Sequence, residues 1–200
     1  MSSSFQHPPA TERNAPPIAD ALATVLQPGD NVFEIGSGTG YHALYMARRF
    51  PAVRWQPSER PEQVRDLVEI VAEAAVPNVR TPVAFDVLLS PWSMSPVDVL
   101  LTVNTFHIMP DDGWREVVRR APHVLKPSGR LCVYGPMRYD DRPLEPSNLD
   151  FEAFLQRVDP ERGIRNADEI RRNAEREGLR LAQDIAMPSN NRFLVFQRTR

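Results

Sequence analysis

The stretch Asn31-Val-Phe-Glu-Ile-Gly-Ser-Gly-Thr-Gly-Tyr41 decides the fold of this 200-residue chain. Residues 31–35 are mainly apolar and predict a short strand, which runs directly into a glycine-rich turn. A helix is predicted after the turn, from about Tyr41 to Phe50, where Pro51 ends it. A strand, a glycine turn and a helix in this order are typical of the first unit of an α/β sheet. The turn then lies at the carboxyl end of the strand, where such sheets bind ligands.

The rest of the chain continues the alternation. Strands are predicted over residues 53–57, 83–86, 97–103, 130–134, 179–187 and 192–197, and helices over residues 18–26, 60–75, 112–125, 151–158 and 166–177. The first helix is predicted to begin near Pro16 and Pro17, because proline suits a first helical turn. Alternation of this kind indicates a doubly wound, mostly parallel sheet with helices on both faces. We expect one α/β domain over residues 11–200, after a flexible tail of residues 1–10.

Composition excludes several classes of protein. The 24 Lys+Arg against 26 Asp+Glu residues give a net charge of −2, without a basic tract, so nucleic-acid binding is not predicted. No apolar run is long enough for a membrane-spanning helix, and residues 1–9 do not resemble a secretory signal. The single cysteine, Cys132, cannot form an internal disulfide, and a cytoplasmic location is therefore expected. No set of side chains has metal-ligand spacing, so no metal is predicted.

The residues of the glycine turn indicate which ligand it binds. Glu34 stands in an apolar strand, and a buried unpaired charge is costly, so we expect it to meet a donor or a cationic ligand group. The glycines follow the pattern Gly-x-Gly-x-Gly rather than the dinucleotide pattern Gly-x-Gly-x-x-Gly. A pyrophosphate would be repelled by Glu34, whereas a phosphate-free ligand with an amine fits. S-adenosylmethionine is such a ligand, and Gly36, Ser37, Gly38 and Gly40 are expected to bind it together with Glu34.

Two further acids follow strands of the same sheet. Glu59 lies 19 residues after Gly40, close to the separation of about 20 at which an acid binds a ribose diol. Asp86 ends the third predicted strand, where it can receive an adenine amino group, and its neighbour Val87 is assigned to the same cofactor site. Taken alone, Glu59 is better explained as a solvated loop carboxylate, and Asp86 is equally well explained as a turn or capping residue; three acids at the ends of three successive strands together favour a site. Asn104, directly after the fourth strand, is expected to line the cofactor pocket.

These motifs resemble those of class I S-adenosylmethionine-dependent methyltransferases, as does the turn Leu125-Lys-Pro-Ser-Gly129. A narrower resemblance is to a methyltransferase-like family long filed as a domain of unknown function, whose members have no agreed substrate. The segments that carry it are Glu12–Asn14, Trp55–Glu59, Asn104–Pro110, Tyr134–Pro136, Ser147-Asn148, Asp159-Pro160, Gly163–Arg165 and Met187–Asn191. The resemblance implies a Rossmann-like sheet of seven strands with an antiparallel last strand, and S-adenosylmethionine as cofactor. Glu59 stands where an aspartate is expected, and a glutamate still binds a diol.

Residues after the central strands are candidates for catalysis. His107 is the best candidate for a general base, because the ordinary pKa of histidine is near neutral, although a packing or capping role fits equally. Tyr134 and Arg138 follow the fifth strand and are expected to cover the acceptor site, with Arg138 holding a carboxylate. Four polar residues are expected around the mouth of the pocket as substrate contacts: Arg13, Asn14, Asn190 and Asn191. A turn role fits Asn190 and Asn191 equally well.

The sequence therefore predicts an S-adenosylmethionine-dependent methyltransferase that acts on a small molecule, and it leaves the oligomeric state open. One alternative keeps the cofactor but cyclises or cleaves it, and a second is a non-catalytic module that only binds it. A nicotinamide oxidoreductase is disfavoured by the spacing of the glycines.

Overall fold

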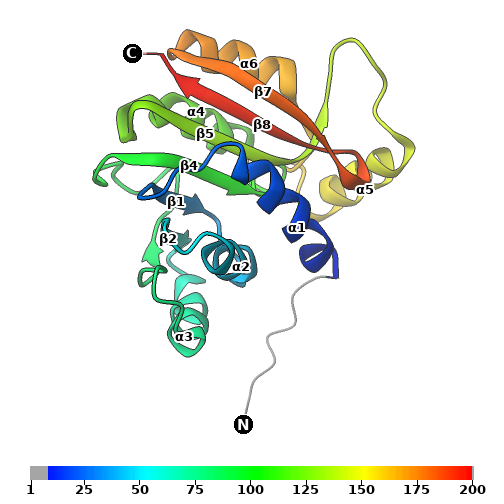
Figure 1. The fold of residues 1–200 in the computed structure, drawn as a ribbon. Helices are drawn as coiled ribbons and strands as arrows, with labels where there is room; N and C mark the ends of the chain where they lie inside the picture. Colours follow the sequence, from blue (N-terminus) through cyan, green and yellow to red (C-terminus); the bar gives the residue numbers. More distant parts are fainter. Residues whose placement is uncertain (1–8, 200) are drawn as a thin grey trace. The chain divides into compact units, whose positions relative to one another are not determined.

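The structure is a computed structural model that describes residues 9–199. It divides into two compact units, Met1–Asp86 and Val87–Arg200. Each unit combines strands and helices, and eight strands lie within the described residues (Figure 1). Of the predicted tail, residues 1–8 lie outside the described residues, and Pro9 and Ala10 begin a helix. None of the helices formed by residues 9–199 has both the length and the apolar character to span a membrane.

The first unit contains three parallel strands. Its elements are α1 (Pro9–Ala23), β1 (Asn31–Ile35), α2 (Tyr41–Arg49), β2 (Arg54–Glu59), α3 (Val64–Ala74) and β3 (Val83–Ala84). β2 lies between β3 and β1 and pairs with both in parallel. The strand predicted over residues 31–35 is confirmed, and β2 extends two residues beyond its predicted end. The carboxyl ends of β1 and β2 therefore lie at the same edge, which brings the glycine turn next to Glu59.

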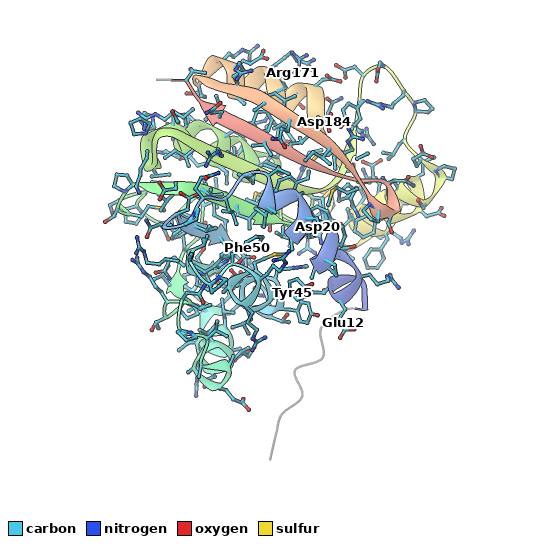
Figure 2. All side chains as sticks on the ribbon, viewed as in Figure 1. Glu12, Asp20, Tyr45, Phe50, Arg171 and Asp184 are labelled. Carbon is cyan, nitrogen blue, oxygen red and sulfur yellow. The ribbon has the colours of Figure 1, made fainter. Side chains whose placement is uncertain are left out.

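Helix α1 corrects one prediction. It begins at Pro9 rather than near Pro16, and Pro16 and Pro17 lie inside it. Proline removes a helical hydrogen bond, but its fixed φ angle is compatible with a helix. Burial outweighs this loss, because the helix packs Ala15, Ile18 and other apolar side chains inward. The exposed face carries Glu12 and Asp20 (Figure 2).

The second unit contains a mixed sheet. Its elements are β4 (Val97–Val103), α4 (Asp111–Val124), β5 (Leu125–Arg138), α5 (Pro146–Val158), β6 (Arg165–Asn166), α6 (Ala167–Arg176), β7 (Leu179–Met187), a 3₁₀ turn (Pro188–Asn190) and β8 (Asn191–Arg198). The strand order is β4-β5-β8-β7, with β6 paired to β5. β4 and β6 are parallel to β5, whereas β8 is antiparallel to β5 and β7. The antiparallel last strand is thus confirmed, and the short β6 raises the seven strands implied by the resemblance to eight.

The turn predicted at Lys126–Gly129 lies within the bounds of β5. Val97 pairs with Leu125 and Val99 with Arg130, so four residues of β5 are unmatched by β4. Ser128 within this insertion has a left-handed φ of 62°. β5 is therefore longer than the predicted strand 130–134 because the turn is accommodated as an irregularity of the strand rather than as its boundary.

Two helices of the second unit, α4 and α6, lie side by side on one face of its sheet (Figure 1). Arg115 of α4 and Glu169 of α6 form an ion pair between them at 2.5 Å. Asn166 caps α6, since its side-chain oxygen accepts a hydrogen bond from the backbone N–H of Glu169 at 2.9 Å. These contacts fix the segment that leads from α5 through β6 into α6.

One amide holds the end of α2 to the start of β2. The Asn78 Nδ2 group donates to the carbonyl oxygens of Ala47, Phe50 and Val53 at 2.9, 3.1 and 2.7 Å. The backbone carbonyl of Asn78 also accepts from the N–H of Trp55 at 2.8 Å. We expect Asn78→Asp to lower the free energy of unfolding by about 2–4 kcal/mol, because a carboxylate would face three carbonyl oxygens near a helix C-terminus. Urea denaturation measures this loss.

The matched control is Asn31→Asp. The Asn31 side chain accepts a hydrogen bond from Arg54 at an exposed site, a role that a carboxylate keeps. Its effect is expected to stay within about 0.5 kcal/mol. Equal losses for the two variants would show that the three donated hydrogen bonds do not determine the stability at Asn78.

Candidate functional site

The glycine turn leaves open space beside its backbone. Gly38 has a φ of 54°, and a Cβ atom built there would meet no atom within 4 Å. Gly40, with a φ of 74°, begins α2, and a Cβ there would lie 2.7 Å from Leu67 Cδ1. Gly36 also has a left-handed φ, of 69°. The turn therefore packs closely against α3 at Gly40 and offers free access to its backbone at Gly38.

Glu59 ties the turn to the end of β2. Its Oε2 accepts a hydrogen bond from the N–H of Gly38 at 2.8 Å, and its Oε1 accepts one from the N–H of Arg60 at 2.9 Å. The side chain is buried, with 7% of its surface exposed, so it is not a solvated loop carboxylate. A carboxylate has about four lone-pair positions. About two of them remain available after these two hydrogen bonds.

Glu34 is a buried carboxylate with a single strong donor. It is 1% exposed, and the indole N–H of Trp55 donates to it at 2.8 Å. Burial raises the pKa of Glu34 to about 7, an effect opposed by the Trp55 hydrogen bond and supported by the charge of Glu59. Sequence reasoning expected a donor or a cationic ligand for Glu34 but did not identify Trp55. Trp55 reaches Glu34 because β1 and β2 are neighbouring strands, a pairing that the sequence analysis did not assign.

Ser37 places a buried hydroxyl next to Glu34. The hydroxyl makes no hydrogen bond of good geometry, although its proximity lowers the pKa of Glu34 and so opposes the effect of burial. The turn thus combines a free hydroxyl, open space at Gly38, spare lone pairs on Glu59 and a carboxylate that ionises near neutral pH. These are the groups that a ligand with an ammonium and a ribose diol needs, so the residues present fit S-adenosylmethionine.

The remaining site residues of the first unit are not all at the turn. Asp86 follows Phe85, whose N–H donates to the carbonyl oxygen of Glu59 at 2.8 Å, so Asp86 is the next residue after a contact with the end of β2. On α1, Arg13 is exposed and Asn14 is buried. Val87 begins the second unit.

In the second unit, Asn104 and His107 lie over one position of β5. Asn104 has a left-handed φ of 56°, and its N–H donates to the carbonyl oxygen of Tyr134 at 2.9 Å. A Cβ atom on Gly135 would lie 3.5 Å from His107 Nδ1 and 3.7 Å from Asn104 Oδ1. The loop after β4 therefore brings these two side chains together above Gly135.

The His107 imidazole is buried and uncharged. It is 6% exposed and packs edge-on to the Phe151 ring, with 5.4 Å between ring centroids. Burial, together with the positive charges of Arg165 and Arg162, lowers the pKa of His107 to about 4. At neutral pH the ring can accept a hydrogen bond, but it is a weaker base than a free imidazole.

Arg165 holds the loop that carries His107. Its guanidinium donates to the carbonyl oxygens of Phe106 at 3.1 Å, Met109 at 2.6 Å and Glu161 at 2.8 Å. The N–H of Gly163 also donates to the carbonyl oxygen of His107 at 3.1 Å. Sequence reasoning noted Gly163–Arg165 only as part of the narrower resemblance and assigned it no role.

Tyr134 points into the protein interior. The residue is 1% exposed, and its buried hydroxyl makes no hydrogen bond of good geometry. Burial raises the pKa of Tyr134 to about 12, although the nearby Asn191 opposes this. The hydroxyl therefore stays protonated and acts as a donor rather than as a base.

Three of the predicted substrate residues line one hollow of about 140 Å³ at the carboxyl end of β5: Arg138, Asn190 and Asn191. Met137, Arg142, Leu144, Glu145, Asn148, Met187 and Arg192 are among its other lining residues. Arg138 does hold a carboxylate, but it is that of Glu152 in the same chain. Among residues 9–199 no three His, Cys, Asp or Glu side chains are grouped so as to hold a metal ion.

The sequence matches one protein family over almost its whole length. The model of the family described as "Protein of unknown function (DUF938)" matches residues 5–198.

Many solved structures share the fold. An O-methyltransferase family protein from Burkholderia thailandensis has a TM-score of 0.80 at 19% identity, and the match covers 95% of this chain and 57% of that one. An O-methyltransferase family 2 protein from Planctomyces limnophilus, solved in complex with apigenin, has a TM-score of 0.78 at 20% identity over 94% and 58%. The mitomycin 7-O-methyltransferase MmcR has a TM-score of 0.75 at 23% identity over 90% and 52%. At these identities the likeness establishes the α/β fold, and the chain spans just over half the length of these proteins.

The raised pKa of Glu34 makes a prediction about stability. Between pH 4.5 and about 7 the folded protein keeps the Glu34 proton while the unfolded chain releases it, so stability falls as the pH rises through this window. Glu34→Gln keeps an oxygen for Trp55 and does not ionise. Relative to the wild type, we expect it to gain on the order of 2–3 kcal/mol between pH 4.5 and 8. Urea denaturation at several pH values measures the difference, with the exposed Glu62→Gln as control. Parallel pH profiles for the wild type and Glu34→Gln would contradict it.

The contacts of Arg165 predict the ionisation of His107. Arg165→Met removes a nearby positive charge, and the pKa of His107 should rise toward 6.5. Arg165→Lys keeps the charge, and the pKa should stay low. An NMR titration of the imidazole signals, with His107→Asn to assign them, measures both. A pKa that is the same in the wild type and in Arg165→Met would assign the low value to burial alone.

Proposed function

The chain belongs to the family described as protein of unknown function DUF938, and from the geometry of its glycine turn we propose that it is an S-adenosylmethionine-dependent methyltransferase acting on a small-molecule acceptor. The contact between Gly38 and Glu59 is the observation that carries this proposal. It joins a turn with open backbone to a buried carboxylate that has spare lone pairs, and these are the two features that a ribose next to a glycine turn requires.

The first unit provides the cofactor contacts in this proposal. Glu59 accepts hydrogen bonds from the ribose diol while it keeps those from Gly38 and Arg60. Glu34 and the free hydroxyl of Ser37 bind the ammonium end, and the absence of a side chain at Gly38 allows close approach. Bound S-adenosylmethionine supplies an electrophilic methyl group on a sulfonium. S-adenosylmethionine contains no phosphate, so the site needs no phosphate contacts. The buried carboxylate of Glu34 would repel a phosphate group.

The second unit provides the acceptor contacts. The neutral His107 accepts a hydrogen bond, and the protonated Tyr134 donates one, so both orient an acceptor rather than carry charge. Positioning of this kind supplies much of the acceleration of a displacement reaction. The hollow at the end of β5 has room for part of a small molecule. The complex of the Planctomyces protein with apigenin supports an acceptor of this size.

Calorimetry tests the cofactor site. We expect the wild type to bind S-adenosylmethionine and Glu59→Ala to bind it about 10- to 150-fold more weakly, since one charge-assisted hydrogen bond contributes roughly 1.5–3 kcal/mol. The control is Glu62→Ala, which removes an exposed carboxylate three residues away. Binding of NAD(H) without S-adenosylmethionine would overturn the proposal, and an unchanged affinity in Glu59→Ala would remove Glu59 from the site.

The products distinguish methyl transfer from reactions of the cofactor itself. S-adenosylhomocysteine, formed with a fraction of small metabolites, supports transfer to an acceptor. Methylthioadenosine formed without any acceptor would contradict methyl transfer. It would indicate an enzyme that cyclises or cleaves the cofactor.

A further inference from the structure

The hollow at the end of β5 contains three guanidinium groups that are already neutralised. Arg138 pairs with Glu152, which lies on α5 with 15% of its side chain exposed. Arg192 pairs with Asp184 at 2.7 Å (Figure 2 labels Asp184). Arg142 stacks on the Tyr139 ring at 3.9 Å and pairs with Asp141 at 3.2 Å. The hollow is thus lined by arginines without offering an unpaired positive charge to a ligand.

The carboxamides of the hollow keep free hydrogen-bonding positions of both kinds. Asn148 is 6% exposed, and one N–H of its Nδ2 donates to the carbonyl oxygen of Asn190 at 3.4 Å. One N–H of the Asn190 Nδ2 donates to Ser147 Oγ at 3.3 Å. Within the described residues, the side-chain oxygens of Asn148 and Asn190 accept no hydrogen bond, and each Nδ2 keeps its second N–H. A ligand in the hollow therefore meets acceptors beside donors, and a hydroxyl can pair with both.

The turn that carries Asn190 is strained. Ser189 and Asn190 both have a left-handed φ of 56°, which is unfavourable for serine and tolerated by asparagine. A non-glycine residue keeps such an angle where its surroundings hold it, and this is common at ligand-binding sites. The hydrogen bond from Asn190 Nδ2 to Ser147 Oγ holds the exposed Asn190 side chain at the edge of the hollow.

We propose that this hollow binds a neutral, hydroxyl-bearing small molecule, and that Glu152 excludes carboxylates from it by holding Arg138. To say that this ligand is the methyl acceptor rests on the proposed methyltransferase function. The preference of the hollow for such a ligand is testable without cofactor.

A hydroxyl, a carboxylate and an ammonium differ in the contacts that each can make in the hollow. A hydroxyl donates to the free oxygen of Asn148 or Asn190. A carboxylate has no hydrogen to donate, and it has to displace Glu152 or Asp184 to reach a guanidinium. An ammonium can donate to the same oxygens, but it would lose hydration on entry, a desolvation cost that a neutral hydroxyl avoids. The Nε atom of Arg138 is buried without a partner and so is not accessible to a ligand either.

Methionine methyl NMR provides the test, because Met137 and Met187 line the hollow. Benzyl alcohol and benzoate are the probes, since they share a ring and differ in charge. We expect benzyl alcohol to shift both methyl signals saturably, at a concentration about tenfold lower than benzoate needs, which is a difference of 1.4 kcal/mol. Met137→Leu and Met187→Leu assign the signals. Equal or tighter binding of benzoate, or no shift with either probe, would overturn the proposal.

Glu152→Gln tests the exclusion. It keeps the shape of the side chain and frees the charge of Arg138, so benzoate should bind about tenfold more tightly, with benzyl alcohol unchanged. Glu145→Gln is the matched control, since it removes an exposed carboxylate of the same hollow for which no contact with an arginine is found among the described residues. An equal gain in both variants would overturn the role of Glu152. If calorimetry shows no S-adenosylmethionine binding while benzyl alcohol is still preferred, the methyltransferase is rejected and the ligand preference stands.

Discussion

The hydrogen bond from the Gly38 N–H to Glu59 Oε2 is the constraint on which the first unit depends. It joins two residues that are 21 positions apart and lie at the ends of neighbouring parallel strands. A turn of three glycines has a large conformational entropy, so without such a tie its backbone N–H groups would not stay directed to one side. The carboxylate that fixes the turn also keeps free lone pairs, so in the proposed function the same group would serve both the fold and the cofactor.

In the second unit a loop is held in place by a cation, the Arg165 guanidinium, rather than by a carboxylate. Arg165 donates to three backbone carbonyls and thereby orders the loop of Phe106 and Met109, which has no regular structure of its own. A planar guanidinium suits this task because its donors diverge in fixed directions. The arrangement has an electrostatic consequence, because burial and, to a smaller extent, the positive charge of Arg165 lower the pKa of His107 and keep the imidazole neutral. The residue that orders this loop therefore also contributes to the weak basicity of its histidine.

Local sequence pattern was sufficient where burial alone determines structure. The strands 31–35, 97–103 and 179–187 were predicted with their observed bounds. For the first two, short and mostly apolar segments rich in valine and isoleucine or leucine are typical of strands buried in a parallel sheet. The start of α1 was mispredicted because Pro16 favours a helix start locally, whereas the burial of Ala15 and Ile18 extends the helix past it. The position of Glu59 beside the glycines could be predicted, since parallel strands end at the same edge.

Partners that depend on strand register or on distant loops could not be predicted. Trp55 reaches Glu34 because β1 and β2 pair in one particular register, which no local pattern encodes. The same limit applies to Arg138, whose chemistry favours a substrate carboxylate until the placement of α5 supplies Glu152.

The two units differ in how their buried charged groups are paired, and this difference matters for function. In the first unit a carboxylate is left with a hydrogen-bond donor but no cation, which suits a positively charged ligand. In the second unit every arginine of the hollow has its own carboxylate or aromatic partner, which suits a neutral one. The proposed charged cofactor and uncharged acceptor thus follow from the same principle, namely which ionic partners the fold has already provided.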